Sequence, residues 1–302
     1  MTSSRRTATI VGLLFLTQTV SFIIAEQLIT GVLKGADYLA GVPAQTSALT
    51  LGGLFAALSG VAVVGIAVLL FPLLKPTSEP LALGYVCERV IELALQLVFF
   101  LVMPLLMIAI GNGLRDGTMA ASTSQSLGPI LNALHDEAIV VLYLVTSVGG
   151  TILAALLYRS LLVPHWIAVL GLIGYPALFV GCILDLFGVT DVTKGAGLIA
   201  VAPGGLFELI LPIWLLGKGF SSSGQGLSQR RSTDRDNTMT AMVQDSHGSP
   251  DALALKGHRQ TRDRRRRGAD PLLVTAVGDG WARTPDASAR NRWARHIKNN
   301  PK

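Results

Sequence analysis

Six long apolar runs constrain the fold of this chain more than any other feature. They cover residues 8–33, 48–74, 81–110, 138–158, 166–187 and 197–216. A helix needs about 20 apolar residues to cross a bilayer, so each run is long enough to span one. Lipid offers no hydrogen bonds to the backbone, which favours helices, and the runs lack the alternation of barrel strands. The sequence therefore predicts an all-α fold, an integral membrane bundle of six transmembrane helices.

Charge divides the chain into two regions. Only 15% of the residues are charged, against about 25% in soluble domains. Residues 1–220 hold nine Lys or Arg and eleven Asp or Glu, whereas residues 221–302 hold sixteen and eight. We predict a six-helix transmembrane domain at 1–220, followed by a disordered basic cytoplasmic tail at 221–302.

Basic residues between the runs predict the orientation. With the N-terminus inside, five of them face the cytoplasm and three face outside. The positive-inside rule favours this threading, with both termini cytoplasmic and the chain in the plasma membrane. The first run follows Arg5 and Arg6, as the apolar region of a signal peptide would. It is longer than such a region and no A-x-A cleavage pattern follows, so we expect an uncleaved helix.

Two connections carry structural predictions. Lys75 and Pro80 bound a tight turn, so the second and third helices should form an antiparallel hairpin. The longest connection, residues 111–137, is rich in Ser, Thr and Gly. We expect a solvated outside loop there, with a short interfacial helix at 127–134. A lid or a binding surface is the alternative.

The third run contains three charged residues, Glu88, Arg89 and Glu92, with Gln96 one turn further on. A charge at the bilayer centre costs roughly 2.5–3.5 kcal/mol on insertion scales, so such residues usually face a bundle interior. Glu88, Glu92 and Gln96 share one helical face, and Arg89 is spaced to pair with Glu92. Glu92 lies near the midplane, whereas Glu88 lies nearer the cytoplasm, where it can reach water.

In the sixth run, Glu208 also lies near mid-depth. We predict a buried polar cluster of Arg89, Glu92 and Glu208, whose excess negative charge a shared proton could neutralise. A structural clamp is the first interpretation of this cluster. A proton or cation relay, or the polar floor of a ligand cavity, is the alternative. Further polar positions within or near the runs are Glu88, Gln96, Tyr175, Asp185 and Glu26.

Enzyme signatures are absent from the sequence. It has no H-E-x-x-H, G-x-S-x-G, Walker or G-x-G-x-x-G motif in a suitable context, and its five histidines lie outside the apolar runs. Both cysteines lie within apolar runs, so no disulfide framework is predicted. We therefore expect no catalytic residues, no metal site and no cofactor, and the pattern favours a protein that is not an enzyme.

The tail contains a basic patch at Arg262, Arg264, Arg265, Arg266 and Arg267. Such a patch is attracted to anionic lipid on the cytoplasmic leaflet. Basic runs also suit phosphate, but no specific nucleic acid is expected. A solvated tail without a partner, or an extension produced by a shifted reading frame, remains the simplest interpretation.

Several motifs occur in an order typical of one family. They are Arg6-Thr-Ala-Thr-Ile-Val-Gly-Leu-Leu-Phe-Leu, Lys75-Pro, Arg89-Val-Ile-Glu92, Leu157-Tyr-Arg-Ser160 with Pro164, Gly171-x-x-Gly174-Tyr175, Asp185, Pro203 and Glu208-Leu-Ile-Leu-Pro-Ile-Trp-Leu-Leu-Gly-Lys-Gly219. Residues about 5–220 thereby resemble the bacterial membrane family known as domain of unknown function 4386. The resemblance implies an integral membrane protein, and it brings no reaction, substrate or cofactor.

Two classes of function follow. The first is a non-catalytic helical bundle that binds or senses a lipid or a membrane partner. The second is a small transporter or ion-coupled permease that uses the carboxylates of Glu92 and Glu208. The lipid bilayer is the one partner that the sequence predicts, and no protein partner is indicated.

Overall fold

The computed structural model describes residues 3–35 and 37–221, together with residues 233, 237–238 and 240. All regular secondary structure in these residues is helical. The long helices are α1 (Ser3–Val32), α3 (Thr46–Leu74), α4 (Glu79–Leu97), α5 (Met103–Arg115), α6 (Ala121–Ser160), α7 (His165–Leu186) and α8 (Leu198–Gly217). The short elements are α2 (Tyr38–Gly41), η1 (Val42–Ala44), η2 (Val98–Val102) and η3 (Gly195–Gly197).

Six helical segments of the described chain are long and apolar enough to cross a membrane. They are Ser4–Val32, Thr46–Leu74, Glu79–Arg115, Ala121–Ser160, His165–Leu186 and Gly195–Gly217. Large apolar side chains on their outer faces stay exposed, as at Val61, Ile173 and Ile213. Exposed apolar surface of this extent suits lipid rather than water. The predicted all-α membrane bundle of six helices is confirmed.

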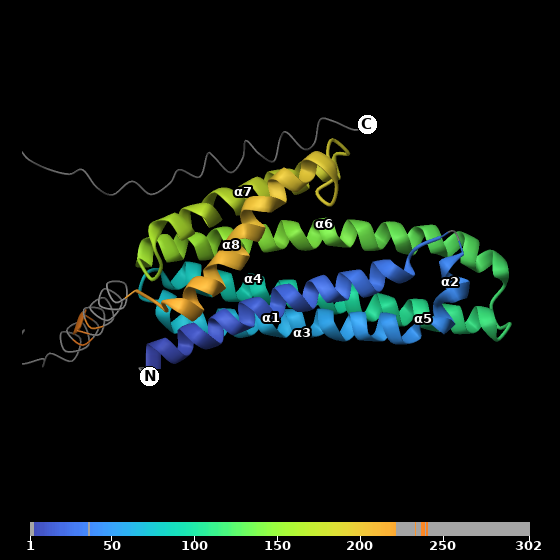
Figure 1. Ribbon diagram of the computed structural model, residues 1–302, viewed down its shortest axis with the longest axis horizontal. Coiled ribbons are helices and arrows are strands. Elements are labelled where there is room, and N and C mark those ends of the chain that lie inside the picture. Colours follow the sequence, from blue (N-terminus) through green and yellow to red (C-terminus); the bar gives the residue numbers. More distant parts are fainter. Residues whose placement is uncertain (1–2, 36, 222–232, 234–236, 239, 241–302) are drawn as a thin grey trace, which may run out of the picture. The chain divides into compact units, whose positions relative to one another are not determined.

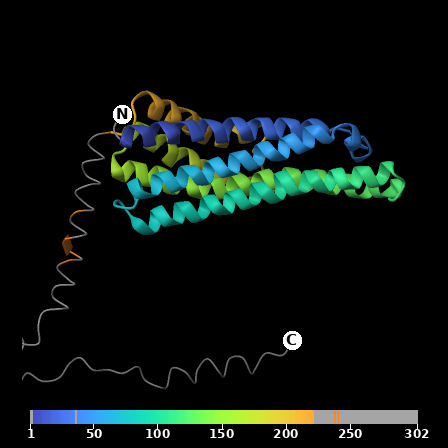
Figure 2. The ribbon, with the colours of Figure 1, turned by 90° about the horizontal axis from the view of Figure 1, so that it is seen from below.

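The six segments form a closed ring in chain order. Each packs against the next, α1 on α3, α3 on α4, α4 on α6, α6 on α7 and α7 on α8, and α8 returns to α1. Figure 1 shows α1, α3, α5 and α6 running well beyond the shorter α7 and α8, toward α2. The long helices lie side by side again in the second view (Figure 2). The ring leaves an interior that side chains from all six segments share.

The connection between the third and fourth spans is much shorter than predicted. The expected loop at 111–137 is wrong, because α5 continues to Arg115 and α6 begins at Ala121. The buried residues of early α6 recur every three or four positions, in the order Ser124, Gly128, Leu131, His135, Ala138 and Leu142. This spacing gives a helix one continuous packing face, even where the composition is polar. The interfacial helix expected at 127–134 is part of α6.

The third span changes its helical geometry midway. The turn η2 is a π-helix placed between α4 and α5. Pro104 follows it at the start of α5 and has no N–H to donate to the carbonyl of Phe100. A π-turn is a common way to absorb such a lost hydrogen bond. The turn places the Phe100 ring in the core, where it is fully buried.

Candidate functional site

Helix α4 carries the polar residues of the site on one face. Glu88, Arg89, Glu92 and Gln96 are all buried, with 2–7% of each residue exposed. Val90 and Ile91, on the opposite face, are about half exposed toward the lipid side. The pattern follows from helical periodicity, because positions three or four apart share a face. Glu88 was expected to reach water, and its burial corrects that expectation.

Arg89 contacts two carboxylates. Its Nη1 donates to Oε2 of Glu92, and its Nε lies 3.3 Å from Oε2 of Glu88. The guanidinium also stands 5.1 Å from the centre of the Tyr85 ring, within cation–π range. One cation thus serves two buried anions on its own helix. The arrangement differs from the predicted cluster, in which Glu208 rather than Glu88 was the second carboxylate.

Two consecutive glycines of α6 make room for the site. A β-carbon on Gly149 would overlap the carboxylate of Glu88, and one on Gly150 would overlap the ring of Tyr175. Both side chains therefore rest directly against the α6 backbone. The sequence contains this Gly-Gly pair, but neither glycine follows a pattern that would reveal which side chains fill the space.

Helices α7 and α8 hold the remaining carboxylate. The hydroxyl of Tyr175 donates to Oε1 of Glu208 over 3.1 Å. The two helices cross closely, since a β-carbon on Gly174 would meet the backbone of Pro203 and Gly204. The hydrogen-bond partner of Glu208 is thus a neutral phenol, and none of the described Lys, Arg or His residues forms an ion pair with it.

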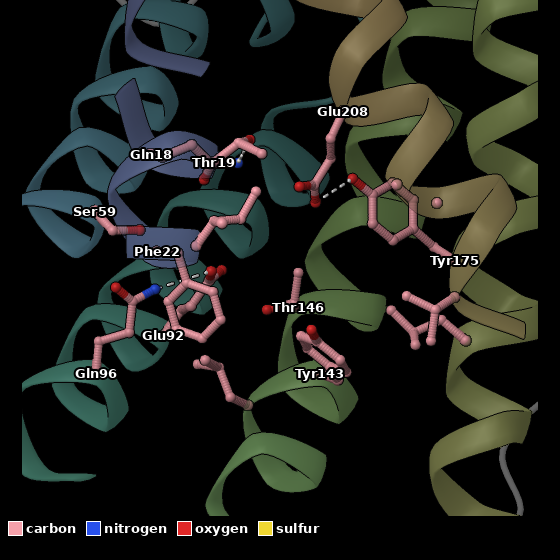
Figure 3. A pocket seen from close by; sticks show the side chains of 16 residues that line it. Gln18, Thr19, Phe22, Ser59, Glu92, Gln96, Tyr143, Thr146, Tyr175 and Glu208 are labelled. Atoms are coloured by element: carbon pink, nitrogen blue, oxygen red, sulfur yellow. Dashed lines mark hydrogen bonds between the residues drawn. The ribbon is translucent and has the colours of Figure 1, made fainter. Parts of the chain in front are cut away.

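These groups surround a cavity of about 210 Å³ in the centre of the ring. Every span contributes to its wall, including Ser59 of α3 and Thr146 of α6 (Figure 3). Glu92 and Glu208 approach it from opposite sides (Figure 3). Its full lining is Gln18, Thr19, Phe22, Ile23, Ser59, Glu92, Gln96, Leu142, Tyr143, Thr146, Tyr175, Leu178, Val201, Gly204, Gly205 and Glu208.

The cavity is partly open, and its lining includes exposed residues of both α1 and α8. At the cytoplasmic side of the predicted threading, α1 and α8 are joined, because Arg5 donates to the carbonyls of Leu216 and Gly217 over 2.7 and 3.0 Å. From there the two helices diverge (Figure 1). The lining residues Ile23 of α1 and Gly205 of α8 are exposed. Both residues lie well inside apolar spans, so this exposed part of the cavity wall faces the lipid side.

A family model described as "Domain of unknown function (DUF4386)" matches residues 10–219. The chain belongs to the DUF4386 family. No curated protein and no solved structure matches it. The matched range contains all six spans, the cavity and every polar residue of the site described above.

The DUF4386 protein has a second buried polar contact, which sequence reasoning missed. His135 of α6 is fully buried, and its Nε2 lies 3.2 Å from Oε1 of Glu26 on α1. Its ring also stacks edge-on against Phe100, which stacks in turn against Phe22 of the cavity wall. The recurring buried spacing of early α6 was the available signal, because His135 falls on that face.

The other predicted positions lie apart from the cavity. The carboxylate of Asp185 accepts a 2.6 Å hydrogen bond from the backbone of Val192, and so braces the connection between α7 and α8. The basic patch at 262–267 lies outside the described residues. In the part of the chain that the structure describes, no three His, Cys, Asp or Glu side chains gather in a way that could hold a metal ion.

Two groups outside the spans have shifted acidity. Hydrogen bonds from the hydroxyl and backbone N–H of Thr193 lower the pKa of Asp191. Burial raises the pKa of Tyr38 to about 12, and its hydroxyl donates to the carbonyl of Gly128 over 3.0 Å. Tyr38 therefore stays a hydrogen-bond donor at all physiological pH values and links α2 to α6.

Proposed function

We propose that this DUF4386 protein is a non-catalytic binding protein that takes a small membrane-soluble ligand into its central cavity. One observation carries the proposal, namely that side chains from all six spans enclose a space with polar groups on its wall. A bundle that needed only mechanical stability would fill such a space, because interiors pack closely. A cavity with a few placed polar groups among apolar ones is typical of ligand sites.

The exposed part of the cavity wall at α1 and α8 supports access from the bilayer. Ile23 and Gly205 line both the cavity and the exposed side of the ring. A ligand dissolved in the lipid would pass between them without crossing the polar ends of the helices. A plasma-membrane location with both termini cytoplasmic belongs to the same proposal, since five of the eight connecting basic residues then lie inside.

The test uses the full chain in lipid nanodiscs and benzyl alcohol as a neutral probe. A cavity of about 150 Å³ accommodates benzene, so 210 Å³ suits a single substituted ring. We expect saturable binding by isothermal titration calorimetry. Gly205→Phe should weaken it by at least about tenfold, because the new ring has room at its own position and fills the cavity mouth.

Gly31→Phe is the matched control, since a β-carbon there also meets nothing within 4 Å and Gly31 does not line the cavity. It should leave binding unchanged. Absence of saturable binding of benzyl alcohol and of related amines to the wild-type chain would reject the proposal.

Transport is the second candidate function. Among the described residues of the spans, Glu88, Glu92 and Glu208 outnumber the one buried cation, Arg89. Carboxylates in excess within a membrane are typical of ion-coupled carriers. Reconstituted vesicles should then show probe uptake that depends on a pH gradient and is lost in Glu208→Gln. If the probe binds but no such flux is seen, transport is rejected and the binding function is retained.

The basic tail patch carries a separate proposal of contact with anionic lipid, based only on its charge. Flotation of the full chain is unsuitable for this question because the spans insert by themselves. The isolated segment 221–302 should bind anionic vesicles at low salt and release them at high salt. Equal binding to neutral vesicles would reject the contact.

A further inference from the structure

The charges around the cavity identify the kind of ligand it suits. Arg89 already contacts Glu88 and Glu92. Glu208 receives a hydrogen bond from the neutral Tyr175 and has no ion-pair partner among the described basic side chains. A carboxylate within a membrane is costly unless a proton or a cation neutralises it. Three carboxylates and one guanidinium leave two excess negative charges, so a further positive charge is favourable next to Glu208.

The hydroxyl of Ser59 is a further polar group on the cavity wall. Ser59 is 1% exposed and lines the cavity, and none of the side-chain hydrogen bonds among the described residues involves its hydroxyl. It points into the cavity from the α3 side (Figure 3). Polar groups usually have a hydrogen-bond partner, so this hydroxyl is free to donate to, or accept from, a molecule in the cavity.

Aromatic rings complete the site. Phe22, Tyr143 and Tyr175 come from three different helices and surround the space between the two carboxylates (Figure 3). The face of an aromatic ring attracts a cation. Walls that combine carboxylates with aromatic rings suit ammonium groups on small organic molecules better than hydrated metal ions, which require several oxygen ligands.

We propose that the cavity binds a small organic ammonium ion, and that the ion replaces a proton on Glu208. In this exchange the protonated carboxyl of Glu208 releases H⁺ to the solvent, and the resulting carboxylate pairs with the ammonium group. The net charge of the site is the same before and after. The inference rests on the proposed binding function and adds the chemical class of the ligand.

The groups that face Glu208 are few. They are Tyr175 from α7, Tyr143 from α6, and Arg89 and Glu92 from α4, whereas α1 contributes the neutral Gln18 and Thr19. Arg89 is shared between Glu92 and Glu88, and the two phenols are uncharged at neutral pH. A dependence of binding on pH therefore reports on the carboxyl groups of the site.

The experiment compares benzylammonium with benzyl alcohol, which is nearly the same size and carries no charge. Both are titrated into the full chain in nanodiscs between about pH 6 and about pH 8, where benzylammonium stays protonated. If one proton leaves as the ion binds, the affinity for benzylammonium rises by up to about tenfold per pH unit. Titrations in buffers of different ionisation enthalpy count the proton directly. The affinity for benzyl alcohol should not depend on pH.

The variant Glu208→Gln should lower the affinity for benzylammonium by at least about tenfold more than it lowers the affinity for benzyl alcohol. Glu208→Asp, which keeps the charge, should retain part of the preference for the ammonium ion and its pH dependence. Glu137→Gln, an exposed change on α6, is the control for altered charge elsewhere.

The outcomes separate the two proposals. If both probes bind equally well and Glu208→Gln changes neither, the ligand class is wrong while the binding function stands. If benzylammonium binds more tightly than benzyl alcohol but releases no proton, the proposed replacement of a proton on Glu208 is wrong. If neither probe binds the wild-type chain, the binding function itself fails. Retained affinity for benzyl alcohol in Glu208→Gln shows that this variant is folded.

Discussion

The carboxylate of Glu88 on α4 rests against the backbone of Gly149 on α6, at a place where a β-carbon would overlap it. This contact sets how closely the two helices approach at the level of the buried ion pairs. It also gives a charged side chain a position that only glycine on the facing helix permits.

Gly149→Ala should therefore destabilise the bundle. The added methyl group overlaps Glu88, so either α4 and α6 separate or the contact of Glu88 with Arg89 breaks. Overpacking typically costs about 1–3 kcal/mol, and a disturbed buried charge adds to this. We expect a lower thermal unfolding midpoint in detergent. Gly84→Ala, on α4 with nothing within 4 Å of the new methyl, should be neutral or slightly stabilising.

Arg89→Ala should be among the most damaging single changes in the chain. It removes the cation that Glu88 and Glu92 share and leaves two carboxylates buried beside each other. Removing one partner of a buried ion pair costs about 3–5 kcal/mol. The folded yield in detergent should fall sharply. Arg115→Ala, which breaks an exposed pair with Asp116, should have no measurable effect.

Arg89→Lys separates charge from geometry. A lysine keeps the positive charge but lacks the forked guanidinium that reaches two carboxylates. An intermediate unfolding midpoint is expected. A variant as stable as wild type would show that charge alone matters at this position.

Tyr175→Phe tests the hydrogen bond that joins α7 and α8. The ring still fills the recess at Gly150, so only the hydroxyl that donates to Glu208 is lost. We expect a loss of about 1 kcal/mol. In the double variant with Glu208→Gln, the two losses should not add, because both changes affect one interaction. Full additivity of the two unfolding free energies would contradict the direct contact.

Thr193→Ala should raise the pKa of Asp191 toward its ordinary value. The hydroxyl of Thr193 is the leading cause of the lowered pKa, and carboxyl carbon NMR can follow the titration. A lowered folded pKa contributes stability above the unfolded pKa of about 3.9, and this stability is lost as the pH falls through the lower folded value. Asp191 is exposed, so the effect on unfolding should be small.

The sequence predicted the spans well because apolar length is a strong signal in lipid. Helical spacing within the third span predicts that Glu88, Glu92 and Gln96 share a face and that Arg89 can pair with Glu92. The partner of Glu208 did not follow, because the crossing of α7 and α8 at Gly174 brings Tyr175 next to it. Spacing along one helix carries no information about which helix packs opposite.

The prediction of a loop over the early part of α6 was wrong for a different reason. The Ser, Thr and Gly content predicts a loop, whereas Ser124 and Gly128 are small residues on a packing face. Such residues let helices approach closely, and they resemble loop composition when only their polarity is considered. For the same reason, the composition predicts an outside position for His135, which is in fact buried on this face.

Because the helices differ in length, one part of the bundle lies in the lipid and another part extends into water. Helix α6 has 40 residues and α7 has 22, so α6 is about 60 Å long, roughly twice the apolar thickness of a bilayer. One end of the bundle, with Tyr38 and Gly128, must then stand in water. The hydrophobic effect stabilises that end, so urea should unfold it. The part of the ring that lies in the lipid should stay folded in urea.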